Sequence, residues 1–329
     1  MLKNKKTSLF IGALVGMAII GSIIAISFGA KQISLRVIYD SIFHFEETLD
    51  MQLIRNVRIP RVICSAIVGG ILAVAGAMMQ GVTRNPISEP SIMGVSQGAM
   101  LAVAIHKAMP GVFGIQSTMI AALIGAMISG GLVLIFSMKN VQNVNLSKLL
   151  LAGTAISTFF ISISTVIALV TNQSQNLAFW VAGGFRSVTW NSVYLVAGIG
   201  GVCFVFSILI AKRINVVNLG EEVAVGLGEN PVKVRIYTFI LLIPMCAVSV
   251  AVAGTIGFVG LIVPHIVRKI VGGDYRRILP VTFLCGATLL IYADAAARLI
   301  HQPYETPVGL FTAILGVPFF LYMARKERG

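Results

Sequence analysis

The chain has few charged residues, and this excludes most classes of soluble protein. Asp, Glu, Lys and Arg make up 11% of its 329 residues, whereas a soluble domain carries about 25%. Hydrophobic residues make up 57%. Because so little charge cannot cover a water-exposed surface, we exclude a soluble enzyme, a disordered regulator and a secreted disulfide scaffold. The composition predicts an all-α polytopic membrane protein.

The sequence also lacks the motifs of nucleotide, metal and nucleophilic chemistry. It contains no GxxxxGK[ST] loop, no HExxH pair and no CxxC spacing. Its four cysteines each lie in an apolar run, so we interpret them as packing residues. The net charge of +13 comes without a basic cluster interleaved with aromatic residues, so we predict no nucleic-acid binding. We expect no catalytic residue, no resident metal and no cofactor bound by this chain.

Apolar runs separated by charged and turn residues predict ten membrane-spanning helices in a single domain, residues 1–329. Each run has room for one span, since a helix needs about 20 residues to cross a bilayer. The eighth run is short and contains Pro264. The runs cover residues 9–28, 62–80, 92–108, 115–137, 147–170, 191–211, 234–253, 257–271, 279–297 and 307–324.

The distribution of positive charge predicts the orientation of these spans. Ten spans place both termini on the same side of the membrane. With the termini inside, 17 of the 25 Lys and Arg residues fall in inner segments. Lys and Arg are enriched in cytoplasmic loops, so we expect a multi-pass protein of the bacterial cell membrane with both termini in the cytoplasm.

Two stripes of small residues predict close packing between helices. Gly69, Ala73, Ala77 and Gly81 repeat every four residues along the second run, and Ala121, Gly125 and Ser129 do so along the fourth. Small residues on one face of a helix let two backbones approach closely in lipid. The stripes predict a dense bundle but identify no function.

The loop between the sixth and seventh runs, residues 218–234, is the predicted inner segment with the clearest helix signals. Asn218 and Glu221 have capping-box spacing, Gly226 and Gly228 are suited to end a helix, and Pro231 is suited to begin another. We therefore predict two short cytoplasmic helices. Such a segment either fits a groove on a soluble partner or lies on the membrane as an amphipathic connector.

Asp294 is the acid that the sequence places inside a span, and it raises the alternative of ion-coupled secondary transport. Arg298 follows four residues later, so the two side chains share a helical face. We interpret them as a structural salt bridge rather than a proton relay. If the chain moves a solute uphill, we expect the energy to come from another subunit.

Ten ordered sequence blocks extend across residues 30–325. They are Arg58–Arg61, Gly69–Gln80, Arg84–Pro90 with Gly94–Gly98, Leu149–Gly153, Trp180–Gly184, Asn218–Glu222, Gly254–Arg268, Ala293–Arg298, Glu305–Gly309 and Gly316–Phe319. These blocks resemble the FecCD-type permeases, the membrane subunits of iron-siderophore, haem and cobalamin ABC importers. The number and order of the blocks make the resemblance specific.

The resemblance implies a type II ABC importer permease fold with ten transmembrane helices, and a division of labour among subunits. The implied partners are two cytoplasmic ATPase subunits that bind ATP and Mg²⁺, a second permease subunit (a paralogue or a second copy) and an extracytoplasmic substrate-binding protein. Loop 218–234 corresponds to the family's coupling helices, which dock on the ATPase. The implied ATPase-coupling residues are Asn218, Leu219, Gly220, Glu221, Glu222, Ala224, Gly226, Leu227 and Gly228.

The resemblance further implies binding-protein docking and gating residues. Arg58, Arg61 and Arg298 match arginines that engage acidic side chains of the binding protein; lipid headgroups are the alternative partner for these cations. Residues 145–147, Asn145, Leu146 and Ser147, correspond to the inner gate. Among the family's cargoes, we expect a ferric siderophore imported by alternating access, with haem or cobalamin as the alternative.

Overall fold

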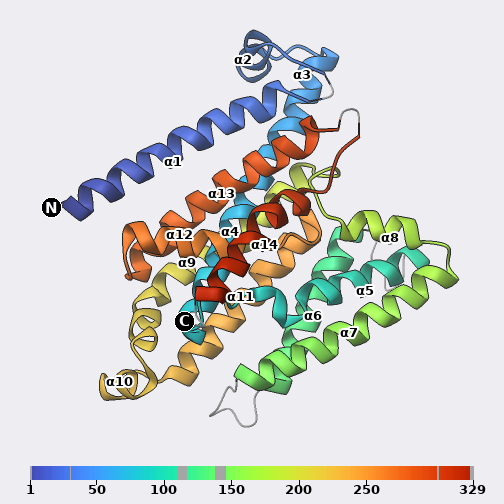
Figure 1. Ribbon diagram of the computed structural model, residues 1–329. Coiled ribbons are helices and arrows are strands. Elements are labelled where there is room, and N and C mark those ends of the chain that lie inside the picture. The colour runs from blue at the N-terminus through green and yellow to red at the C-terminus, as the bar shows by residue number, and fades with distance from the viewer. Residues whose placement is uncertain (1, 30, 110–116, 138–145, 302–303, 327–329) are drawn as a thin grey trace.

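The computed structural model describes residues 2–29, 31–109, 117–137, 146–301 and 304–326, and within these residues it contains helices and no β-strand. Each of the ten predicted apolar runs coincides with one helix of the bundle (Figure 1). These helices are α1 (Leu2–Ser27), α4 (Ile59–Thr83), α5 (Val95–Ala108), α6 (Thr118–Ser137), α7 (Leu146–Val170), α9 (Trp190–Asn218), α11 (Pro231–Ala253), α12 (Val259–Val271), α13 (Tyr275–Leu299) and α14 (Val308–Lys326).

The all-α membrane architecture is confirmed, but helix length does not establish the number of ten spans. Among the described residues, seven of the ten helices are long and apolar enough to cross a bilayer. The other three, α5, α12 and α14, are shorter. Helices α5 and α12 are short because the chain entering each of them, residues 84–94 and 254–258, is largely irregular rather than helical.

Short elements mark the two ends of the bundle. The chain turns between α9 and α11 through α10 (Glu221–Gly226), and α2 (Leu35–Phe43), α3 (Leu49–Leu53) and α8 (Ser174–Val181) lie at the opposite end (Figure 1). We call these the α10 end and the α8 end. Helices α1 and α14 run in opposite directions, so the N-terminal end of α1 and the C-terminal end of α14 both lie toward the α10 end (Figure 1). This agrees with an even number of crossings.

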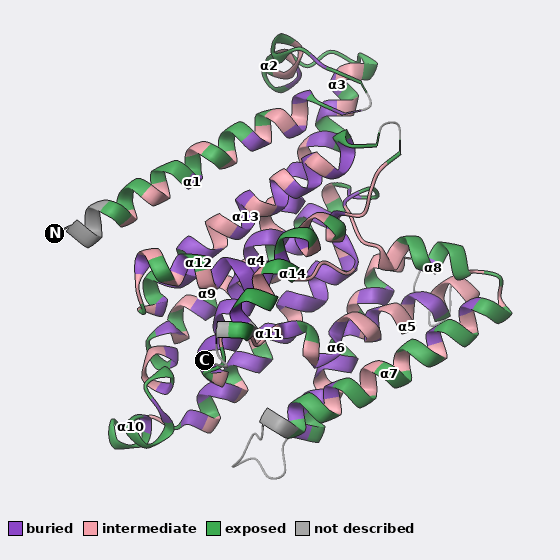
Figure 2. Cartoon of the chain, in the orientation of Figure 1, coloured by how far each residue is buried: buried purple, intermediate pink, exposed green. Residues whose placement is uncertain are grey.

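Helix α4 is the centre of the larger half of the bundle and is buried along most of its length (Figure 2). It packs against α9, α11, α12 and α13. A Cβ atom at Gly69 would lie 2.3 Å from the backbone oxygen of Gly286 on α13, and one at Gly76 would lie 1.9 Å from that of Gly260 on α12. The first predicted stripe of small residues therefore includes a close packing contact between α4 and α13. Gly76, which is not in the stripe, provides a second close contact, between α4 and α12.

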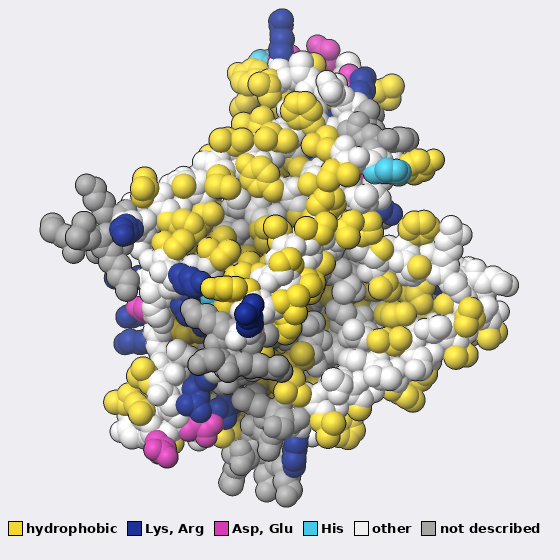
Figure 3. Space-filling view, viewed as in Figure 1, with side chains coloured by type: hydrophobic (Ala, Val, Ile, Leu, Met, Phe, Trp, Pro, Cys, Tyr) yellow, Lys and Arg dark blue, Asp and Glu magenta, His cyan; other side chains and the backbone are white. Residues whose placement is uncertain are grey.

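Helices α5, α6 and α7 pack together beside this half, and α11 contacts both α4 and α6. The second predicted stripe lies between α5 and α6. A Cβ atom at Gly98 would lie 2.4 Å from the backbone oxygen of Gly125 and 2.2 Å from the Cβ atom of Ser129. Hydrophobic side chains dominate the flank of the bundle seen in Figure 3, as expected of a surface facing lipid.

Asp274 caps the N-terminus of α13 and provides a test of pH dependence. Its carboxylate accepts hydrogen bonds from the backbone nitrogen of Arg276 at 3.0 Å and from the side-chain nitrogen of Asn215 at 2.7 Å. Hydrogen bonds from Arg276, chiefly from its side chain, and from Asn215 lower the pKa of Asp274 from 3.8 to about 2. Its stabilising contribution is thus complete above about pH 4 and is lost as pH falls toward 2.

We therefore expect the difference in thermal stability between the wild type and Asp274→Asn to shrink as the pH is lowered from 5 to about 2.5. Asparagine keeps the capping acceptor but removes the charge. Unfolding midpoints of detergent-purified protein across this range measure the difference. A difference independent of pH would show that the charge of Asp274 does not contribute.

Candidate functional site

The predicted coupling segment forms one short helix rather than two. Helix α9 continues to Asn218, so the capping box predicted at Asn218 is wrong. Gly220, with φ of 129°, is the N-cap of α10, and Pro231 begins the long helix α11 directly. Glu221 does not reach back to cap Asn218, because its carboxylate pairs with Arg235 of α11 instead. The predicted end of the helix is confirmed: Gly226 is its last residue and Gly228 has φ of 79°.

A buried arginine anchors α10 to the bundle. Arg235 is 5% exposed; its Nη2 donates to Glu221 Oε1 at 2.5 Å and its Nε donates to the Val82 carbonyl of α4 at 3.2 Å. The hydrogen bond and charge of Arg235 lower the pKa of Glu221. Ala224 packs inward and is fully buried. A displacement of α10 would therefore be transmitted to α4 and α11.

The outer face of α10 is apolar and exposed. Leu219 is 65% exposed, Val223 48%, Val225 64% and Leu227 64%. Glu222 is exposed beside them. Exposed apolar residues gathered at one tip and rimmed by charge are typical of an interaction surface. We call these four residues the α10 tip.

The three predicted docking arginines lie together at the α8 end, but they are buried and have partners within the chain. Arg58, Arg61 and Arg298 are each 5–7% exposed. Arg58 donates to the carbonyls of Ile26, Ser27 and Lys31, and Arg298 Nη2 donates to the carbonyl of Ala25 at 2.9 Å. Two of the three thus hold the C-terminal end of α1, where a positive charge is favourable.

Arg61 and Asp294 form the centre of this arginine cluster. Both oxygens of Asp294 accept hydrogen bonds from Arg61, at 2.8–3.1 Å, and Arg298 Nε lies 3.4 Å from Asp294 Oδ2. Arg61 also pairs with Glu305 at 2.7 Å. The predicted pair of Asp294 and Arg298 is confirmed, and Asp294, only 1% exposed, is enclosed by two guanidinium groups.

Glu305 and Arg186 extend the arginine cluster toward the surface. Glu305 pairs with both Arg61 and Arg186. Partial burial opposes ionisation of Glu305, but the hydrogen bond and charge of Arg61 outweigh this effect and lower its pKa. Glu305 and Arg186 are the more accessible members of this charged group, with side chains 29% and 36% exposed.

Glu89 is a second acid within the bundle, and the sequence analysis missed it. Residues 90–93 lie against α6, α7 and α11, and the backbone nitrogen of Phe258 donates to Glu89 Oε1 at 2.8 Å. Phe258 has φ of 68° and precedes α12, so the carboxylate lies at a helix N-terminus, where negative charge is favoured. The sequence signal is the pair Pro86 and Pro90, which prevents a regular helix around Glu89.

The structure leaves the gate prediction open. Asn145 lies outside the described residues, and Leu146 and Ser147 begin α7. Among the described residues, no group of three His, Cys, Asp or Glu side chains could hold a metal ion.

The helical membrane bundle, with an anchored apolar tip at one end and a buried charge cluster at the other, agrees with the ABC importer permease class that the sequence resembles, and comparison with known proteins shows this class. The model of the FecCD transport family matches residues 17–326. The chain belongs to the FecCD transport family.

Similar proteins are transport permeases and align over nearly their whole length. The chain is 42% identical to the iron(3+)-hydroxamate import permease FhuB of Bacillus subtilis, covering 94% of this chain and 81% of FhuB. It is 38% identical to the Fe(3+)-citrate import permease YfmD of the same organism, covering 99% of this chain and 96% of YfmD. It is 33% identical to the hemin permease HmuU of Yersinia pestis, covering 97% of this chain and 96% of HmuU. A solved metal-chelate type ABC transporter in an inward-facing conformation matches with a TM-score of 0.82 at 27% identity, covering 96% of this chain and 98% of that one.

Proposed function

We propose that this chain is the permease subunit of an ABC importer that moves a ferric siderophore complex inward by alternating access. Separate ATPase subunits bind and hydrolyse ATP, and the α10 end faces the cytoplasm. Two of the relatives above are named for ferric chelates, which supports this cargo over haem; cobalamin is the remaining alternative. The excess of Lys and Arg in the predicted inner segments supports this orientation.

The observation that carries the proposal is the α10 tip. Four exposed apolar side chains would be costly in water, and a groove on an ATPase subunit would bury them. Arg235 and Glu221 connect the tip to α4 and α11, which form the core of the bundle. Closure of the ATPase subunits would thus move the helices that surround the transport path.

A hydroxyl stripe on α7 supports pairing with a second permease subunit. Thr154, Thr158, Ser162 and Thr165 are exposed along one side of this helix, and each donates to a backbone carbonyl of its own helix. A polar stripe gains nothing from lipid but suits a wet path shared between two subunits. The second subunit is either a paralogue or another copy of this chain.

Docking of a substrate-binding protein at the α8 end is part of this proposal. Because Arg58, Arg61 and Arg298 already have intramolecular partners, a binding protein would contact them only by exchanging those partners. The accessible neighbours of these arginines are Arg186 and Glu305, whose side chains are 36% and 29% exposed. We propose that they form the rim of the docking surface.

We expect replacement of Val223 and Leu227 together by Glu to reduce ATP-driven uptake at least tenfold, about 1.4 kcal/mol. The two charges would have to be buried in the ATPase groove, and apolar-to-charged changes at a buried contact are costly. The assay is uptake of a ferric siderophore, with coupled ATP hydrolysis, in proteoliposomes containing the assembled transporter. Arg213→Ala, which removes an exposed ion pair with Glu229 at the same end, is the matched control and should have little effect.

Normal coupling in the Val223 and Leu227 variant would contradict the proposed role of α10. Uptake that needs no ATP and stops when the proton gradient collapses or Asp294 is replaced by Asn would favour ion-coupled transport instead. The enclosure of Asp294 between Arg61 and Arg298 argues against that alternative, since the Asp294 side chain is only 1% exposed.

A further inference from the structure

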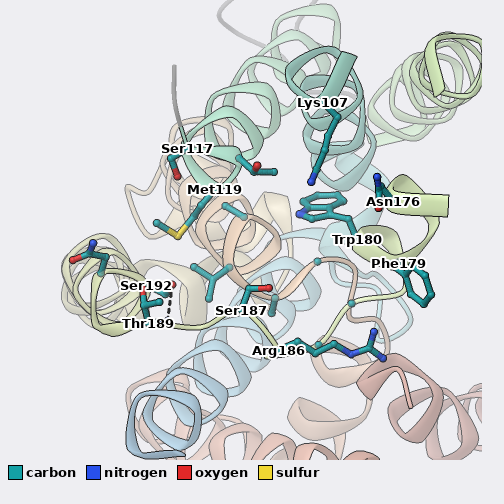
Figure 4. A pocket seen from close by; sticks show the side chains of 18 residues that line it. Lys107, Ser117, Met119, Asn176, Phe179, Trp180, Arg186, Ser187, Thr189 and Ser192 are labelled. Carbon is teal, nitrogen blue, oxygen red and sulfur yellow. Dashed lines mark hydrogen bonds between the residues drawn. The ribbon is translucent and has the colours of Figure 1, made fainter. Parts of the chain in front are cut away.

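A cavity of about 520 Å³ opens at the α8 end, between the C-terminal ends of α5 and α11 and the N-terminal ends of α6 and α9 (Figure 4). Its size lies within the range of small-molecule sites. We call it the α8 pocket. It is separate from the arginine cluster, although Arg186 lies on its border and also pairs with Glu305.

One wall of the α8 pocket is fixed by direct backbone contact. Gly184 donates its backbone N–H to the carbonyl of Ala253 at 2.8 Å. Gly183 and Gly254 have φ of 73° and 65°, and a Cβ atom at Gly254 would lie 2.8 Å from the Cα atom of Gly183. The chain leading into α9 is thus joined tightly to the end of α11, so the pocket is formed before any ligand enters.

The pocket is positively charged. Lys107, on the last turn of α5, points into it toward Trp180 (Figure 4). Lys107 forms no hydrogen bond or ion pair with any residue that the structure describes, and no Asp or Glu lines the pocket. Residues 110–116, which follow α5 in the sequence, contain no acidic residue either. An uncompensated ammonium group in a concave site attracts anions.

The remaining lining suits an organic oxyanion. The hydroxyl groups of Ser117 and Ser187 and the indole N–H of Trp180 supply neutral donors, and the rings of Trp180 and Phe179 supply apolar surface. These neutral donors, together with the ammonium group of Lys107, match the carboxylate groups of an organic anion. A charge-neutral chelate would leave Lys107 without a partner.

We propose that the α8 pocket binds the carboxylate face of an anionic ferric chelate of the citrate type, with Lys107 as its charge partner. This inference rests on the proposed import function and names the class of cargo. The site holds the chelate after delivery at the α8 end and before it enters the path between subunits.

The test measures equilibrium binding of radiolabelled ferric citrate to the purified full chain in nanodiscs of zwitterionic lipid. We expect saturable binding that weakens at least tenfold in Lys107→Gln, because a hydrogen bond to a charged group is lost. Lys107→Arg should stay within about threefold of the wild type. Arg36→Gln removes an exposed cation at the same end but outside the pocket and should leave binding unchanged.

Two further measurements make the proposal falsifiable. A charge-neutral ferric trihydroxamate should bind wild type and Lys107→Gln equally. Phosphatidylglycerol added to the nanodiscs should not weaken ferric citrate binding; if it competes in the wild type but not in Lys107→Gln, the anion in the pocket is a lipid phosphate and the proposal is overturned. Equal affinity of wild type and Lys107→Gln for ferric citrate overturns it as well.

The two proposals fail in different ways. ATP-driven uptake by the assembled transporter, with ferric citrate binding insensitive to Lys107, would refute only the α8 pocket. Uptake of any ferric chelate by the chain without ATPase subunits would refute the import mechanism, whatever Lys107 does.

Discussion

Replacement of Asp294 by Ala is expected to lower the free energy of unfolding by about 3–5 kcal/mol, the cost of removing one partner from a buried ion pair. Asp294 is only 1% exposed, so the variant leaves Arg61 and Arg298 facing each other across a buried position. Glu305 is then the remaining carboxylate of the arginine cluster. Two buried guanidinium groups would then share one acid that is itself partly exposed.

The measurement is the fraction of detergent-purified protein that remains monodisperse after heating through a temperature series. Asp50→Ala is the matched control, because Asp50 pairs with Lys31 at the same end of the bundle but both side chains are exposed. An exposed pair contributes about 0–1 kcal/mol. Equal midpoints for the Asp294 and Asp50 variants would show that the arginine cluster does not stabilise the fold.

Replacement of Gly76 by Ala should destabilise the bundle by about 3 kcal/mol, the upper end of the usual range for overpacking. The added Cβ atom would lie 1.9 Å from the backbone oxygen of Gly260 and 2.3 Å from its Cα atom. Neither atom belongs to a side chain that can rotate away. Helices α4 and α12 would have to separate, and the contacts along their interface would be lost.

Gly201→Ala provides the control for this substitution. Gly201 lies within α9, and a Cβ atom there would meet no atom within 4 Å. Alanine also favours the helix by about 1 kcal/mol relative to glycine, so this variant should be as stable as the wild type or more so. If Gly76→Ala were equally harmless in the same heating assay, close approach of α4 and α12 would not be required.

The helices could be predicted from the sequence because their signals are local. Long apolar runs and small residues at four-residue spacing are visible within one segment, and the structure confirms both. The pairing of Asp294 with Arg298 was predictable for the same reason, since four residues separate them on one helix.

The details that sequence analysis missed depend on contacts between distant segments. Arg61 was assigned to the surface, but its partners Asp294 and Glu305 are 233 and 244 residues away. The capping box at Asn218 failed because α9 continues through Asn218, and Glu221 pairs with Arg235, which is 14 residues further along the chain. Glu89 was overlooked because its partner, the backbone nitrogen of Phe258, is 169 residues further along the chain.

The attachment of α1 has a consequence for the order in which the protein is assembled during synthesis. The carbonyl groups at the end of α1 are held by Arg58 and Arg298, and the hydroxyl group of Tyr292 donates to the Met17 carbonyl in its middle. Because synthesis proceeds from the N-terminus, the ribosome releases α1 well before residues 292–298. Arg58 can therefore hold the end of α1 soon after this helix enters the bilayer, whereas the contacts from Tyr292 and Arg298 form only after most of the intervening helices have been made.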